Sequence, residues 1–265
     1  MQKSLSISKS AKSAWAAFIY FTRLPFWKIY SPPKASYRGV VEFWPLVGWL
    51  TGSIMAATLY FGSWVMPHAL AVLAAIVVRV LLTGAFHEDG LADFCDGFGG
   101  GGKDRQRVLD IMKDSRIGTY GVIGLILYFS MLFLCLLHLP VKTAALAIIA
   151  ADPFSKMLAG QIVQMMPYAR NEQEAKSRVT YRKVSVAGGI SLAFQGLLPS
   201  LPLFLLGDVA LRWELVVFVP CLVMYFLYLK IWNTLRGYTG DCCGALFLLV
   251  ELSTYLMICI TAEQV

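Results

Sequence analysis

The chain has 265 residues, of which 58% are hydrophobic and only 15% are charged, and its formal net charge is +7. This balance excludes a disordered chain, which needs low hydrophobicity and high charge, and six cysteines are too few for a disulfide scaffold of this length. It is equally untypical of a soluble domain. The composition therefore predicts an all-α, polytopic integral membrane helical bundle.

Seven apolar segments approach the roughly 20 residues that a helix needs to cross a bilayer. Short turns at 66–68 and 139–141 join the first segment to the second and the third to the fourth, which predicts two helical hairpins. The expected spans are 46–66, 70–86, 120–139, 143–165, 188–206, 215–231 and 242–261.

Residues 1–45 are expected to form a separate N-terminal segment, and residues 46–265 a transmembrane helical catalytic domain. Trp15, Phe18 and Ile19 lie at helical spacing, and Pro25 ends the pattern. Because lysines precede this stretch, it is typical of a short amphipathic helix that lies in the membrane interface.

Basic residues are distributed unevenly along the chain. They occur before the first span, in the loops 88–119 and 167–187, and just before the last span, whereas the turns on the opposite side carry only Lys142 and Arg212. The positive-inside rule then predicts a cytoplasmic N-terminus, cytoplasmic polar loops and an external C-terminus. The net positive charge suits binding to anionic lipid at the membrane surface. We expect no nucleic-acid partner, because the cations are spread over loop edges and no binding module is visible.

The loop after the second span concentrates carboxylates, with seven of the 16 acidic residues between Glu88 and Asp114. If the second span continues as a helix, Asp89, Asp93 and Asp96 fall within about 60° of one another. Three like charges so close repel one another unless a cation lies among them. Ligands that are all oxygen favour Mg²⁺ or Mn²⁺ over zinc. We favour this metal site over a solvated helix end, because no Lys or Arg is interleaved with Asp89, Asp93 and Asp96.

Cations follow these acids, among them Lys113 and Arg116. Carboxylates for a metal and cations for phosphate oxygens together suit phosphoryl transfer. The glycine-rich run 97–104 fits a phosphate-binding loop only formally, because no strand precedes it and Asp104 stands where Ser or Thr is needed. We expect a flexible turn there.

Four charged residues, Arg79, Asp152, Lys156 and Glu251, lie inside apolar spans. A charge at mid-bilayer costs about 2.5–3.5 kcal/mol on insertion scales, so each should face a partner or a wet cavity. Asp152 and Lys156 are four residues apart and can pair with each other. The G-x-x-x-G spacings at 48–52 and 240–244 predict close helix packing.

Two further polar residues border the expected site. His87 precedes the acidic run and suits either a proton carrier or a polar helix cap. Asp241 opens the last span, where it is expected to be the N-cap and to add a carboxylate on the active side.

Two long motifs, H-E-D-G-L-A-D-F-C-D-G at 87–97 and I-M-K-D-S-R-I-G-T-Y-G at 111–121, resemble the cobalamin synthase family, the adenosylcobinamide-GDP ribazoletransferases of bacteria and archaea. After Arg170 the chain has N-E-Q-E where this family suggests a glycine-rich continuation. Shorter matches follow the family order: F-T-R-L-P at 21–25, P-L-V-G at 45–48, P-Y-A-R at 167–170 and G-Y-T-G-D at 237–241.

The resemblance implies a phosphotransferase of the bacterial cytoplasmic (inner) membrane that joins adenosylcobinamide-GDP to α-ribazole or its 5′-phosphate and releases GMP, with Mg²⁺ as cofactor. Its partners would be these substrates, the lipid bilayer and other enzymes of late cobalamin biosynthesis. Asp89, Asp93 and Asp96 would hold the metal. Glu88 or Asp114 would add a ligand or accept the ribose hydroxyl proton, and Lys113 and Arg116 would offset charge on GMP. His87, Ser115, Arg170 and Asp241 would bind substrate.

Two other functions stay open from the residues alone. A lipid-type alcohol phosphotransferase uses a similar aspartate-rich motif, but its D-G-x-x-A-R run is absent from this sequence. A metal-ion or vitamin transporter would carry its acids at mid-span on broken helices, whereas the acids here concentrate in one loop.

Overall fold

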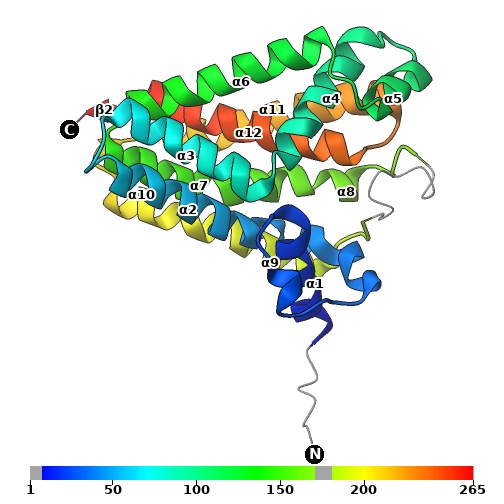
Figure 1. Ribbon diagram of the computed structural model, residues 1–265, viewed down its shortest axis with the longest axis horizontal. Helices are drawn as coiled ribbons and strands as arrows, with labels where there is room; N and C mark the ends of the chain where they lie inside the picture. Colours follow the sequence, from blue (N-terminus) through cyan, green and yellow to red (C-terminus); the bar gives the residue numbers. More distant parts are fainter. Residues whose placement is uncertain (1–7, 171–180, 265) are drawn as a thin grey trace, which may run out of the picture.

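The computed structural model describes residues 8–170 and 181–264, and the described chain is a bundle of long helices with one minute antiparallel strand pair (Figure 1). The helices are α1 (Lys9–Phe21), α2 (Trp44–Gly62), α3 (His68–Thr83), α4 (Phe86–Gly100), α5 (Arg105–Lys113), α6 (Thr119–His138), α7 (Val141–Gly160), α8 (Ile162–Met165), α9 (Val186–Leu197), α10 (Leu201–Leu206), α11 (Trp213–Leu235) and α12 (Gly240–Thr261). Shorter elements are the 3-10 helices η1 (Phe26–Lys28), η2 (Lys34–Phe43) and η4 (Leu198–Ser200) and the strands β1 (Val209–Ala210) and β2 (Glu263–Gln264).

The predicted spans are present, with one change in their architecture. Among the described residues, six helical runs are long and apolar enough to cross a membrane, and a bent pair, α3 with α4, raises the number to seven if it is counted as one span. The fold class is therefore confirmed. The helix of the expected span 70–86 is shorter than expected, because α3 ends at Thr83.

The chain bends by 90° between α3 and α4, so the second span does not continue as a straight helix. Gly84 adopts a left-handed conformation with φ of 66°, and Ala85 follows with φ of 56°. The Ala85 N–H donates to the Val80 carbonyl at 2.9 Å, which closes the end of α3. A glycine at this position is a common helix terminator, and here it turns the acidic helix α4 across the end of the bundle.

Small residues let α2 and α7 approach closely, as the glycine spacing predicts. A Cβ added to Gly48 would lie 2.7 Å from an Asp152 carboxylate oxygen and 3.0 Å from the Pro153 backbone. One added to Gly52 would lie 3.2 Å from the Ile148 carbonyl oxygen. These contacts leave no room for larger side chains at the crossing.

The charges on α7 are paired at this crossing. Lys156 and Asp152 form the predicted ion pair, and both are almost fully buried. Thr51 of α2 donates to the second Asp152 oxygen at 2.8 Å and accepts from the Lys156 amine at 3.0 Å. The Lys156 amine also lies 4.4 Å from the centre of the Phe247 ring of α12. Two charges inside the apolar bundle are thereby compensated.

A second buried ion pair joins four helices. Arg79 of α3 contacts a Glu251 carboxylate oxygen of α12 at 2.6 Å, and its other terminal nitrogen lies 2.5 Å from the Tyr128 hydroxyl of α6. Glu88 of α4 lies 3.8 Å from the same guanidinium. The expectation that Arg79 and Glu251 face partners is confirmed, and they are each other's partners.

The N-terminal helix packs on the segment that follows it. Ala16 and Ala17 of α1 are fully buried, and the Trp15 indole N–H donates to the Tyr30 carbonyl at 2.9 Å. The helical run that contains the first span begins at Lys34. The functional division at residue 45 remains a prediction.

The polar segments gather at one end of the bundle. Figure 1 shows α4, α5 and the start of α6 at that end, and the strand β2 at the other. The glycine run differs from the expected flexible turn, because 97–100 form the last turn of α4 and only 101–103 turn toward α5. Asp104 caps α5 by accepting from the N–H groups of Gln106 and Arg107.

The last span is also capped differently from the prediction. Thr239 is the N-cap of α12, with its hydroxyl accepting from the Cys242 N–H at 3.3 Å. Asp241 lies inside the first turn, and one of its carboxylate oxygens accepts from the Thr239 hydroxyl at 3.4 Å.

Enlarging Gly48 should destabilise the fold, because the added side chain overlaps Asp152 and Pro153. We expect Gly48→Leu to lower the free energy of unfolding in detergent by about 1–3 kcal/mol. Gly189→Leu in α9 is the matched control, since nothing lies within 4 Å of its added Cβ. Equal melting temperatures for the two variants would contradict the close packing of α2 and α7.

Candidate functional site

Two glycines bring α4 and α12 into backbone contact at the polar end. A Cβ on Gly90 would lie 3.1 Å from the Asp241 Cα, and one on Gly244 would lie 3.1 Å from the His87 carbonyl oxygen. Asp241 is therefore beside the helix that carries Asp89 and Asp93. We call Asp89, Asp93 and Asp241 the acidic face.

The three aspartates predicted as metal ligands have different environments. Asp89 is exposed, Asp93 is half-buried and Asp96 is only 8% exposed. Both Asp96 carboxylate oxygens accept backbone N–H groups at the start of α6, from Gly118 at 2.7 Å and from Gly121 at 2.8 Å. Asp96 of α4 thus satisfies two backbone N–H groups at the N-terminus of α6, where a negative charge is favourable.

The donor set of the acidic face suits a hard cation. Among residues 8–170 and 181–264, no three His, Cys, Asp or Glu side chains converge closely enough to hold a metal ion. Mg²⁺ commonly takes only one or two protein carboxylates, keeps several waters and completes its shell with substrate phosphates. Asp89 and Asp93, which lie one helical turn apart on α4, are the residues that could supply such carboxylates.

Two predicted site residues point into the bundle instead. His87 is 1% exposed and packs among the rings of Phe21, Trp44 and Phe247. Glu88 is 4% exposed and faces Arg79. No partner is found among the described residues for His87 Nε2 or for Glu88 Oε2. Both residues therefore lie behind the acidic face rather than on it.

The turn after α5 carries a tight ion pair. Asp114 accepts from the Arg116 guanidinium at 2.6 Å and from its backbone N–H at 3.0 Å. These bonds lower the pKa of Asp114 to about 2. The neighbouring Lys113 and Ser115 are exposed.

Arg170 reaches the polar end through a short backbone pairing. The Tyr238 N–H donates to the Pro167 carbonyl at 2.9 Å, and the Ala169 N–H donates to the Tyr238 carbonyl at 2.8 Å. Burial raises the pKa of the neighbouring Tyr168 to about 12, so its phenol is neutral at physiological pH. Arg170 itself donates to the Leu109 carbonyl of α5 at 3.0 Å. Two basic residues of the loop 167–187, Lys176 and Arg178, lie outside the described residues.

One residue received no individual role from the sequence. Arg105, at the start of α5, donates to the carbonyls of Leu235 at 2.9 Å and Ala169 at 2.6 Å. It lines a cavity together with Lys113 and Arg170. The only sequence signal was its place among several cations after the acidic run, which does not single it out.

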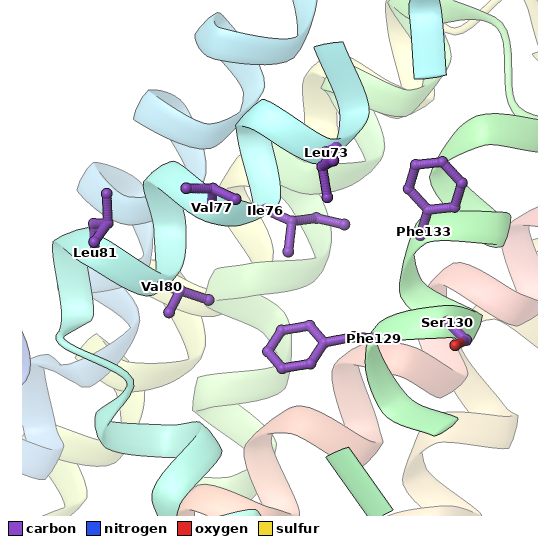
Figure 2. A pocket seen from close by; sticks show the side chains of 8 residues that line it. All are labelled: Leu73, Ile76, Val77, Val80, Leu81, Phe129, Ser130 and Phe133. Atoms are coloured by element: carbon purple, nitrogen blue, oxygen red, sulfur yellow. The ribbon is translucent and has the colours of Figure 1, made fainter. Parts of the chain in front are cut away.

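An apolar pocket of about 560 Å³ lies between α3 and α6 (Figure 2). Figure 2 shows Ile76 and Val80 of α3 and Phe129 of α6 pointing into the gap between the two helices. Ser130 provides its only side-chain hydroxyl, so this pocket offers no group for phosphoryl chemistry. Its lining residues are Leu73, Ile76, Val77, Val80, Leu81, Phe129, Ser130 and Phe133.

The fold and the polar end together define a multi-span membrane protein that gathers carboxylates and cations at one end. A sequence model of the family described as cobalamin-5-phosphate synthase matches residues 13–259. This match covers nearly the whole chain. The chain belongs to that family.

Curated relatives match over almost their full length, and each is described as an adenosylcobinamide-GDP ribazoletransferase. The protein of Leptospira interrogans is 32% identical, with 94% of this chain and 96% of the relative covered. That of Shewanella amazonensis is 34% identical, with 94% and 95% covered. That of Vibrio parahaemolyticus is 36% identical, with 91% and 89% covered. No solved structure matches the chain.

Replacing Asp96 should affect stability, because its carboxylate holds the start of α6. An asparagine keeps the size but offers one acceptor oxygen to two N–H groups, so we expect Asp96→Asn to lower the free energy of unfolding by about 1–3 kcal/mol. The exposed Asp89→Asn should change it by less than about 0.5 kcal/mol. Chemical unfolding in detergent measures both. Equal losses would refute the capping role.

Proposed function

We propose that the protein is an adenosylcobinamide-GDP ribazoletransferase of cobalamin biosynthesis. The observation that carries this function is the α4–α12 crossing, where the helix that bears Asp89 and Asp93 meets the backbone of Asp241 within the motif-bearing segments of a full-length family member. A hydroxyl oxygen of α-ribazole, or of its 5′-phosphate, forms a new P–O bond at the phosphorus next to the corrinoid. The P–O bond within the diphosphate breaks, and its electron pair leaves with GMP.

The acidic face is proposed to position the diphosphate through Mg²⁺. Bound there, Mg²⁺ would neutralise phosphate charge and polarise the attacked phosphorus. Asp89 and Asp93 are the proposed ligands, because they are accessible and lie one helical turn apart. Asp241, whose backbone meets α4 at Gly90, is proposed to orient the substrates. Asp96, in this proposal, supports the site by fixing α6 against α4.

The remaining predicted residues receive roles that fit their positions. Arg116 and Ser115 are exposed at the turn after α5 and are proposed to contact the leaving nucleotide phosphate. The proton of the attacking hydroxyl is proposed to pass to a carboxylate of the acidic face. Asp114 suits that role poorly, because its pKa of about 2 makes it a weak base. Glu88 and His87 are proposed to support α4 from behind.

The polar end is proposed to face the cytoplasm, in a bacterial inner membrane. The argument is the excess of Lys and Arg at that end, since basic residues are retained on the cytoplasmic side. The proposed donor substrate carries a nucleotide, and nucleotides occur in the cytoplasm, which agrees with this orientation. Contact with other enzymes of the late pathway remains a prediction.

The function is tested by GMP release from adenosylcobinamide-GDP and α-ribazole by the purified protein. We expect release to require Mg²⁺, and we expect Asp93→Asn to lower kcat/KM about 100-fold or more. Asp208→Asn is the matched control. Asp208 lies between α10 and α11, and its exposed carboxylate pairs with Lys142 of α7. The rate of GMP release by this variant should stay within about twofold of the wild-type rate. Corrinoid uptake into vesicles without GMP release would favour a transporter instead.

The low pKa of Asp114 leads to a prediction about pH. A depressed carboxyl pKa means that Asp114 stays ionised above about pH 3 and loses its charge only as the pH falls through about 2. Asp114→Asn should therefore leave the shape of the kcat/KM profile unchanged between about pH 5 and about pH 9. A displaced acidic limb in this variant would instead identify Asp114 as the base.

A further inference from the structure

A polar cavity of about 290 Å³ lies between α5 and the segment that leads out of α8. Three of its lining residues are cations, Arg105, Lys113 and Arg170, and we call them the cationic pocket. Asp110 is the single carboxylate in the lining, and one of its oxygens accepts from the Gln106 amide at 2.9 Å. The lining therefore has an excess of two positive charges.

Two of the cations are held in place by the backbone. Arg105 donates to the Leu235 and Ala169 carbonyls through its Nε and one terminal nitrogen, and Arg170 donates to the Leu109 carbonyl. A guanidinium carries more N–H donors than these bonds use. Fixed guanidinium groups lose little conformational freedom on binding an anion, so the pocket is organised before a ligand arrives.

A backbone hydrogen bond links the cationic pocket to the segment that leads into α12. Ala169, which lines the pocket, is hydrogen-bonded to Tyr238, and Tyr238 is three residues before Asp241. Three residues of extended chain span at most about 11 Å. A sugar phosphate is of similar length, so one molecule can reach from the pocket to the reacting phosphorus.

We propose that the cationic pocket binds the phosphate monoester of a phosphorylated acceptor. This inference rests on the proposed function and deepens it, by assigning the 5′-phosphate of the ribazole nucleotide to Arg105, Lys113 and Arg170. The ribose hydroxyl then lies toward the acidic face, where the diphosphate is held.

Charge and volume distinguish this ligand from the diphosphate donor. A phosphate monoester is close to a dianion at neutral pH, which matches the excess of two positive charges. The cavity lacks the exposed carboxylate pair that would carry Mg²⁺ with a diphosphate. Its volume exceeds that of a single phosphate and admits part of the attached sugar. The phosphodiester of a lipid headgroup, which carries one negative charge, is another anionic phosphate at the membrane surface, so the test must separate the two sources.

The experiment compares two acceptors, α-ribazole 5′-phosphate and α-ribazole, in nanodiscs of neutral phosphatidylcholine. Lys113→Gln should lower the ratio of kcat/KM for the phosphorylated over the unphosphorylated acceptor about tenfold, through KM rather than kcat. Lys113→Arg should restore the ratio. Arg107→Gln is the matched control, because it removes a cation from the exposed side of the same helix without lining the cavity, and it should leave the ratio within about twofold.

Several results would overturn the assignment. Equal losses with both acceptors would mean that Lys113 acts on the donor, and an unchanged ratio would mean that the pocket binds no acceptor phosphate. A loss that appears only after anionic phosphatidylglycerol is added would assign the pocket to a lipid headgroup. Absence of GMP release by the wild-type protein with either acceptor would refute the proposed function itself, which these other outcomes leave intact.

Discussion

The buried contact between Arg79 and Glu251 is the interaction on which the arrangement of the polar end depends. A guanidinium inside an apolar bundle must be compensated, and here Glu251 of α12 and Tyr128 of α6 supply the compensation at 2.6 Å and 2.5 Å. Loss of one partner would leave a buried charge unpaired, which costs about 3–5 kcal/mol in soluble proteins. Because Glu88 also faces this guanidinium, the same charge holds α4 against the bundle. The position of the acidic face follows from it.

The carboxylates of α4 differ in what covers them. Glu88 faces inward and meets Arg79, and Asp96, near the far end of α4, meets the start of α6. Asp89 lies two helical turns before Asp96 on nearly the same side of α4, and it is exposed. Residues that look equivalent in a helical projection are thereby divided into supporting groups and accessible groups. Both Asp96 oxygens already accept backbone N–H groups, so we expect the exposed Asp89 rather than Asp96 to contact a cation.

The sequence was sufficient for features that depend on local periodicity or short spacing. Apolar length predicted the spans, and the i,i+4 spacing predicted the pair of Asp152 and Lys156. Contacts between distant segments could not be predicted in this way. Arg79 and Glu251 are 172 residues apart, and no periodicity relates them. Asp96 bonds to Gly121 across 25 residues, because of a turn whose geometry no spacing rule specifies.

The sequence contains a signal for the bend at Gly84, but the uninterrupted run of apolar residues favours a straight helix. Gly84 stands where a helix terminator is expected, yet the apolar run continues to Phe86, so the pattern favoured one straight span. The three-ligand prediction has a separate cause, because Asp89, Asp93 and Asp96 all lie in α4 after the bend, and their spacing does not show that the start of α6 covers Asp96. Whether a side chain of α4 is accessible depends on which neighbouring segments pack over it, and local sequence spacing does not determine that packing.

The central claim is that the carboxylates at the α4–α12 crossing hold the cation that carries the diphosphate. The most direct test is a cryo-electron microscopy map of the protein with Mg²⁺ and adenosylcobinamide-GDP. The account predicts a cation about 2.0–2.1 Å from oxygens of Asp89 or Asp93, with Asp96 still bonded to the start of α6. A cation bound by Asp96 and Glu88, or a diphosphate far from α4, would contradict it.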